Sequence, residues 1–119
     1  MYDVNNIFAK IIRKEIPCKV IYEDKRVLFF EDTNPQAKIH ILGIPKINVI
    51  DFNDFILNAE KEMIVYFFSK IQKVIKILNI EKSGFKIITN SGENGGQEVP
   101  HFHVHIFGGE KLNKINLQY

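Results

Sequence analysis

The fold and the chemistry of this chain centre on residues 95–109, which read Gly95-Gly96-Gln97-Glu98-Val99-Pro100-His101-Phe102-His103-Val104-His105-Ile106-Phe107-Gly108-Gly109. Three of the four histidines of the chain stand here, at every second position. Successive side chains of a β-strand point to opposite faces, so a strand would gather the three imidazoles on one face and the intervening apolar side chains on the other. The β-branched and aromatic residues favour a strand, and a glycine pair stands at each end. The stretch predicts a half-buried strand that presents a row of imidazoles to a cleft.

A row of imidazoles suits either a metal site or nucleophilic and acid–base catalysis. At about 3.3 Å per residue, His101 and His105 would lie about 13 Å apart. Zinc–nitrogen bonds of about 2 Å cannot collect all three imidazoles around one ion. Two neighbouring histidines would need further ligands, and the single cysteine, Cys18, has no C-x-x-C partner. Catalysis is therefore favoured over a metal site and over histidines without function, and we expect no metal and no cofactor.

Length and composition describe an ordinary globular protein. The 119 residues are enough for one domain, residues 1–119, with 45% hydrophobic and 25% charged residues. The net charge of +2 is spread over interspersed residues without a basic run, so nucleic acid is not an expected partner. The chain begins without a signal-peptide pattern, and its most apolar run, residues 63–68, is too short to span a bilayer. We expect a cytoplasmic protein that does not bind membranes.

Periodicity and turn residues predict the elements along the chain. A short helix is expected over residues 6–14 and a long amphipathic helix over 58–78, with an apolar stripe that includes Phe67 and Phe68. Strands are expected over residues 20–23, 26–31, 38–44 and 85–89, followed by the histidine strand. Strands beside one long helix predict an α+β domain with a meandering antiparallel sheet. The surplus of large apolar residues on the long helix indicates core or a dimer interface.

The run from His101 to Phe107 resembles the histidine-triad signature, His-φ-His-φ-His-φ-φ with φ apolar. Residues 7–17, 30–37, 40–46 and 90–97 resemble, in the same order, blocks of the branch called histidine triad nucleotide-binding proteins. The resemblance covers nearly the whole chain. It implies the HIT-like α+β fold, which has a five-stranded antiparallel sheet, a short N-terminal helix and one long helix, and it implies a two-fold homodimer.

The resemblance also implies catalytic roles by matching position. His103 matches the nucleophile, whose ring nitrogen attacks the α-phosphorus and forms a nucleotidyl-histidine that water resolves. Its other ring nitrogen would bond a main-chain carbonyl, here that of His101. His105 would hold the phosphate oxygens, and His101 and His40 match a supporting pair behind the site. For His40, a purely structural role is as well supported as proton handling.

Substrate contacts are implied in the same way. Asp32 matches the carboxylate that binds the ribose hydroxyls, a role that suits a two-oxygen acceptor. Asn90, Gly96 and Gln97 match phosphate or leaving-group contacts. The glycine-rich loop 90–97 by itself allows either an anion site, because its amides can converge, or an ordinary loop. The resemblance also implies apolar walls around the base. The matching residues, each equally compatible with a core position, are Ile7, Phe8, Ile11, Phe30 and Leu42.

Three features depart from well-known members of the branch. Glu98 stands where those members have a serine that donates to the leaving-group nitrogen, whereas bacterial-type members share the Gln-Glu pair. An ionised carboxylate only accepts hydrogen bonds, so Glu98 would contact an amine leaving group or the proton network, or merely cap the loop. Asn6 and Ala9 replace the cysteines of zinc-binding relatives, so that zinc site is not expected. The end of the chain, residues 111–119, lacks the tryptophan-containing tail of some relatives.

The resemblance thus predicts a hydrolase of purine nucleoside phosphoramidates, such as adenosine 5′-monophosphoramidate. Two alternatives stay open. One is dinucleoside polyphosphate hydrolysis or nucleotidyl transfer within the same superfamily. The other is a purine-nucleotide-binding adaptor with residual catalysis, whose task is contact with other proteins.

Overall fold

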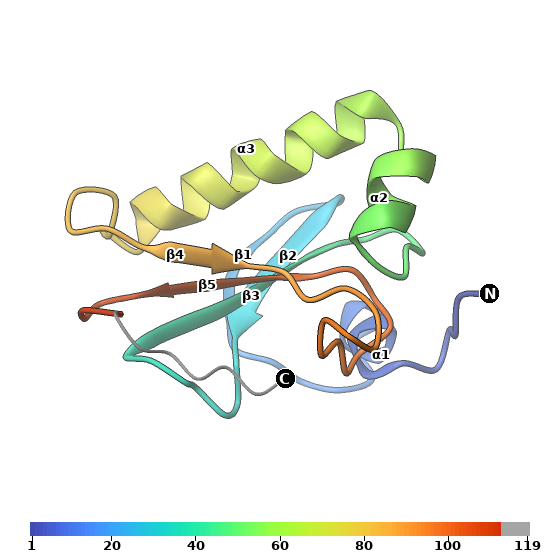
Figure 1. Ribbon diagram of the computed structural model, residues 1–119, viewed down its shortest axis with the longest axis horizontal. Coiled ribbons are helices and arrows are strands. Elements are labelled where there is room, and N and C mark those ends of the chain that lie inside the picture. The colour runs from blue at the N-terminus through green and yellow to red at the C-terminus, as the bar shows by residue number, and fades with distance from the viewer. Residues whose placement is uncertain (113–119) are drawn as a thin grey trace.

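The computed structural model describes residues 1–112, so most of the carboxyl-terminal tail discussed above lies outside the described residues. Its five strands are β1 (Val20–Glu23), β2 (Val27–Glu31), β3 (Ile39–Pro45), β4 (Lys86–Ile88) and β5 (Val104–Gly108). They form one antiparallel sheet in the order β1-β2-β3-β5-β4 (Figure 1). The predicted five-stranded α+β fold is confirmed. The sheet is not a simple meander, because β5 lies between β3 and β4 and is therefore an interior strand.

The helices are α1 (Ile7–Ile12), α2 (Phe52–Asn58) and α3 (Lys61–Ile77). Asn6 caps α1 by accepting a hydrogen bond from the backbone N–H of Ala9, at 2.9 Å. The prediction of one helix over 58–78 was incomplete, because Ala59 has extended dihedral angles and separates α2 from α3. The side chain of Asp51 caps α2 by accepting from the N–H of Asp54, a local signal that the periodicity did not include. No helix of residues 1–112 is long and apolar enough to cross a bilayer.

The sheet separates two apolar layers, with α2 and α3 on one face and α1 on the other (Figure 1). Strand β2 shows how alternation builds both layers, because Val27 and Phe29 join the α3 layer while Leu28 and Phe30 join the α1 layer. Full burial of each large apolar side chain contributes about 1.5–3 kcal/mol of hydrophobic free energy to folding. The sheet is therefore covered on both sides, and the α1 side is the side of the histidines.

The triad strand differs from its prediction in two ways. Strand β5 begins at Val104, so His101 and His103 precede it in an irregular segment, where the N–H of Phe102 donates to the carbonyl of Val49. The alternation of faces nevertheless holds, because Phe102, Val104 and Ile106 pack in the α3 layer. The strand is also fully buried rather than half-buried, and on the face of the imidazoles Phe8 of α1 packs edge-on against the rings of His101 and His103.

The outer surface of α3 carries more apolar side chain than the sheet can cover. Phe68, expected in the buried stripe, is 42% exposed, because it follows the buried Phe67 and is rotated by about 100° around the helix. Val65 and Ile77 are exposed as well. At the edge strand β4, Ile87 is also exposed.

Candidate active site

A cleft of about 230 Å³ lies between α1, the segment 16–18, the end of β2 and the triad. Nine residues singled out from the sequence line it: Ile7, Phe8, Ile11, Phe30, Asp32, Leu42, Glu98, His103 and His105. Their positions follow from the two-layer packing, because α1 lies over the face of the sheet on which the histidines stand. The walls are mainly apolar, and the polar groups are two imidazoles, carboxylates and a threonine.

The ring of His103 is held in one tautomer. Its Nδ1 lies 2.7 Å from the carbonyl oxygen of His101, which can only accept, so Nδ1 carries the proton and Nε2 keeps its lone pair. The ring of Phe8 meets the imidazole edge-on, with centroids 4.9 Å apart and an interplanar angle of 84°. Burial lowers the pKa of His103 below its ordinary value. At neutral pH the structure therefore offers an uncharged imidazole, oriented as a nucleophile requires, in the wall of the cleft.

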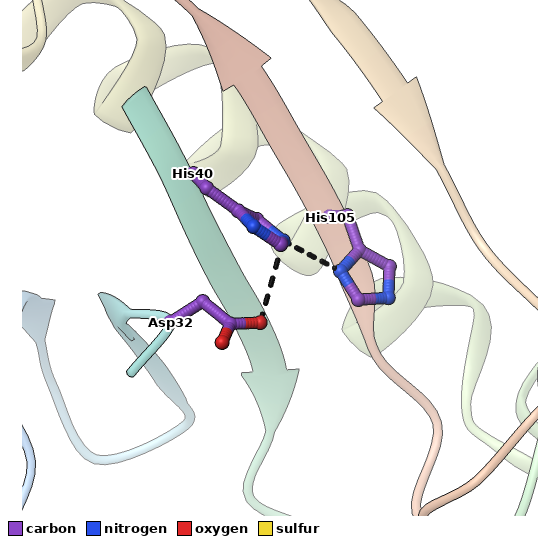
Figure 2. Close-up of side chains that lie close together, drawn as sticks. All are labelled: Asp32, His40 and His105. Carbon is purple, nitrogen blue, oxygen red and sulfur yellow. Dashed lines mark hydrogen bonds and ion pairs between the residues drawn. The ribbon is translucent and has the colours of Figure 1, made fainter. Parts of the chain in front are cut away.

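A second chain of hydrogen bonds determines the tautomer of His105 (Figure 2). The backbone N–H of Gln36 donates to Nδ1 of His40 at 3.1 Å, so neutral His40 carries its proton on Nε2. This Nε2 lies 3.0 Å from Nδ1 of His105, which must accept. The proton of His105 is then on its own Nε2. Burial lowers the pKa of His105 to about 3, so the group acts as a neutral N–H donor rather than as a cation.

Asp32, His40 and His105 are also the residues of the described chain that come closest to a metal site. Their ligand atoms lie within 4.8 Å of one another. A metal on Nε2 of His40 would need the lone pair there and the proton on Nδ1, where the N–H of Gln36 already points. The geometry thus suits a row of hydrogen bonds better than an ion. Asn6 and Ala9, which stand where zinc-binding relatives have cysteines, form the capping hydrogen bond of α1.

Asp32 lines the cleft but already has neighbours within the protein. Its Oδ1 accepts from the N–H of Asn34 at 2.8 Å, and its Oδ2 lies 3.4 Å from Nε2 of His40 (Figure 2). Each carboxylate oxygen has two acceptor sites, so these contacts leave capacity for hydroxyl donors. The residue therefore combines a turn-forming contact with a polar surface toward the cleft.

Three predicted contact residues of the loop 90–97 are not in the lining of the cleft. The Gln97 side chain fastens the loop, since it donates to the carbonyls of Ile50 and Val99 and accepts from the N–H of Gly92. Asn90 donates to the carbonyl of Gly95 at 2.7 Å. The amides of Gly92, Gly96 and Gln97 donate within the loop or to its side chains, so they do not form a ready cradle for an anion. Roles of Asn90, Gly96 and Gln97 toward a substrate stay predictions.

The loop nevertheless depends on one glycine for its shape. A Cβ atom at Gly95 would lie 2.3 Å from the carbonyl oxygen of Ser91, so any other residue would displace the backbone. The loop delivers Glu98, an exposed residue, and Val99 to the lining of the cleft.

His101 and His40 stand behind the cleft, in contact with the two histidines that line it. Six further residues that were not predicted from the sequence also line the cleft: Ile16, Pro17, Cys18, Glu31, Thr33 and Val99. Pro17 and Cys18 follow α1 in an irregular segment without a period that could have placed them. Thr33 and Glu31 flank Asp32 and could have been inferred from it.

Comparisons with known proteins agree with this geometry. A family model described as HIT domain matches residues 13–112. An uncharacterised HIT-like protein of Rickettsia prowazekii is 49% identical over 112 residues, 94% of this chain and 93% of the other. A purine nucleoside phosphoramidase of Escherichia coli is 41% identical over 110 residues, 92% of this chain and 91% of the other. A HIT family hydrolase from Clostridium thermocellum superposes with a TM-score of 0.86 at 35% identity, covering 95% of this chain and 97% of the other. The chain belongs to the HIT-domain family.

Proposed function

We propose that this chain hydrolyses the P–N bond of purine nucleoside phosphoramidates by nucleotidyl transfer through His103. The observation that carries the proposal is the hydrogen bond from Nδ1 of His103 to the carbonyl of His101, which leaves the lone pair of Nε2 available in a cleft with apolar walls. In the first step, a bond forms between Nε2 and the α-phosphorus while the P–N bond breaks, and the amine departs with a proton taken from solvent. In the second step, water attacks the phosphorus, the bond to Nε2 breaks, the nucleotide is released and the proton of the water returns to solvent.

The other groups of the cleft suit the same reaction. The N–H donor of His105 is of the kind that stabilises the phosphate oxygens as charge develops on them. Asp32 provides acceptors for the ribose hydroxyls, and Phe8, Ile11 and Leu42 provide a wall for the base. The name of the Escherichia coli relative, purine nucleoside phosphoramidase, supports this substrate class.

Turnover of adenosine 5′-monophosphoramidate by the purified protein tests the proposal directly. A panel that also contains dinucleoside polyphosphates separates the alternatives within the superfamily. Faster cleavage of dinucleotides than of every phosphoramidate would overturn the proposed substrate class. Tight AMP binding without turnover of any substrate would favour the adaptor alternative.

Metal removal is expected to have no effect on this reaction. Exhaustive treatment with EDTA should leave kcat and KM unchanged, because the tautomer of His40 places a proton where a metal would need a lone pair. Turnover before and after chelation, with atomic absorption to verify metal removal, makes the measurement. Loss of activity that zinc or manganese restores would establish a metal site instead.

Glu98 tests how the leaving amine is recognised. If its carboxylate interacts with a basic amine, Glu98→Gln should lower kcat/KM most for substrates with basic leaving groups and flatten the dependence on leaving-group pKa. Glu93→Gln is the matched control, because Glu93 belongs to the same exposed loop but does not line the cleft. Unchanged kcat/KM for every leaving group would remove Glu98 from the mechanism, since the amide keeps the shape and one acceptor.

We also propose that the chain forms a two-fold homodimer. The support is two exposed apolar side chains one turn apart on α3, Val65 and Phe68, together with Ile87 on β4, an edge strand of the sheet that the described residues form. Exposed apolar side chains and sheet edges both favour association. Sedimentation equilibrium is expected to give twice the chain mass of 13.9 kDa, and a monomer at micromolar concentration would contradict the proposal.

A further inference from the structure

The N-terminal segment contacts the histidine triad from outside the region that the family model matches. Tyr2 lies before residues 13–112 of that match, yet its hydroxyl is 2.6 Å from Nδ1 of His101, which is 99 positions away in the chain. The two rings meet edge-on, with centroids 5.6 Å apart and an interplanar angle of 72°. The other ring nitrogen of His101, Nε2, lies 2.9 Å from the carbonyl oxygen of Pro45.

These two contacts define the direction of each hydrogen bond. A carbonyl oxygen only accepts, so Nε2 of His101 carries a proton and donates to Pro45. Burial lowers the pKa of His101 to about 4, so the ring is neutral at pH 7 and Nδ1 holds a lone pair. The Tyr2 hydroxyl must therefore donate to Nδ1. Both nitrogens of this fully buried imidazole are satisfied in one orientation.

The segment that carries Tyr2 is itself fastened to the protein. The carbonyl of Asp3 accepts from the backbone N–H of Asn6 at 3.2 Å and from its side-chain amide at 2.8 Å. The carbonyl of Val4 accepts from the Arg13 guanidinium at 2.7 Å. Tyr2 is thus held over His101 by contacts that involve neither the cleft nor the triad.

We propose that Tyr2 is a positioning residue for the nucleophile, an inference that rests on the proposed role of His103. The carbonyl of His101 accepts a hydrogen bond from the Nδ1–H of His103, and this bond sets both the tautomer and the direction of Nε2. The position of that carbonyl depends on the His101 ring, which Tyr2 and Pro45 clamp from opposite nitrogens. The hydroxyl of Tyr2 therefore acts on His103 through the side chain and backbone of His101.

Tyr2→Phe isolates the hydroxyl, because it keeps the ring and its edge-on contact. Without the donor, the Nδ1 lone pair of His101 is buried without a hydrogen bond. The free-energy cost of this unpaired acceptor favours a shift of the ring. We expect kcat for an adenosine phosphoramidate to fall about 5- to 30-fold, the size of the loss of one buried hydrogen bond, with less than about a twofold change in KM. Arg13→Gln is the matched control, because it loosens the same segment at Val4 without touching His101.

A measurement on the free protein makes the test independent of catalysis. In long-range ¹H–¹⁵N spectra, Tyr2→Phe should move the Nδ1 resonance of His101 toward that of an imidazole nitrogen without a hydrogen bond. It should also accelerate solvent exchange of the Nδ1 proton of His103 several-fold. Arg13→Gln should change neither. If wild-type protein failed to cleave phosphoramidates, the proposed function would fall while these spectra would still decide the role of Tyr2.

A double-mutant cycle completes the experiment. In a His101→Asn background, Tyr2→Phe should cause no further loss of kcat, because the proposed effect of the hydroxyl on His103 passes through the imidazole of His101. Equal effects of Tyr2→Phe with and without His101 would show a general packing role. An unchanged exchange rate at His103 in Tyr2→Phe would overturn the proposal, as would a loss of the same size in Arg13→Gln.

Discussion

Replacing His103 with alanine is expected to lower kcat for an adenosine phosphoramidate by more than about a hundredfold, which corresponds to more than about 2.7 kcal/mol. Covalent catalysis needs the attacking nitrogen, and His103 is the imidazole of the cleft whose Nε2 has its lone pair available, since the hydrogen bonds place the proton of His105 on Nε2. Single-turnover and steady-state assays measure the loss. His103→Asn should show the same defect with less disturbance of the core.

Nucleotide binding provides the control for this variant. The base, ribose and phosphate contacts would come from other residues, so the Kd of AMP measured by calorimetry should change little in His103→Asn. Retention of more than about a hundredth of the wild-type kcat would show that another group is the nucleophile. Because burial lowers the pKa of His103, wild-type kcat/KM should begin to fall only below the pH at which an ordinary histidine titrates, as Nε2 becomes protonated.

Asp32→Ala is expected to weaken ribonucleotide binding by about 1–3 kcal/mol for each charged hydrogen bond lost, or roughly 5- to 150-fold. A carboxylate that bridges the two ribose hydroxyls loses a partner when the sugar lacks one of them. The same substitution should therefore have little effect on a 2′-deoxy analogue. Calorimetric titration of the wild-type protein and of Asp32→Ala with AMP and with 2′-deoxy-AMP measures the loss of affinity for each sugar.

The contacts of Asp32 inside the protein make Asp32→Asn the necessary companion. The amide keeps an acceptor for the N–H of Asn34, so it preserves the turn but removes the charge and one acceptor. If Asp32 binds the ribose, Asp32→Asn should also lose affinity for AMP and not for the deoxy analogue. Equal losses for both sugars in Asp32→Ala, with none in Asp32→Asn, would assign Asp32 to the turn alone.

Local patterns of the sequence predicted the parts of the fold that depend on neighbouring residues. The period of two around His101, His103 and His105 correctly separated the imidazoles from the apolar side chains, even where the segment is not a regular strand. Asn5 and Asn6 were the two candidate caps of α1, of which Asn6 is the cap, and the apolar period of α3 marked the face that packs on the sheet. Such signals can be read from the sequence because helices and strands place residues of one face at fixed spacings of a few residues.

The sequence by itself determined the strand content, the face on which the histidines stand and the resemblance that assigns them roles. Only the tertiary structure decided the separate helix α2, the interior place of β5, and the contacts that set the tautomers of His40, His101 and His105, whereas the resemblance had already implied the carbonyl partner of His103. His40 meets His105 across 65 positions of the chain, and Tyr2 meets His101 across 99. Pairings at this distance leave no period in a single sequence, because they arise when buried polar groups must find partners as the layers pack together. A local pattern predicts the face on which a histidine lies, but which of its ring nitrogens is protonated depends on residues that contact it only in the folded chain.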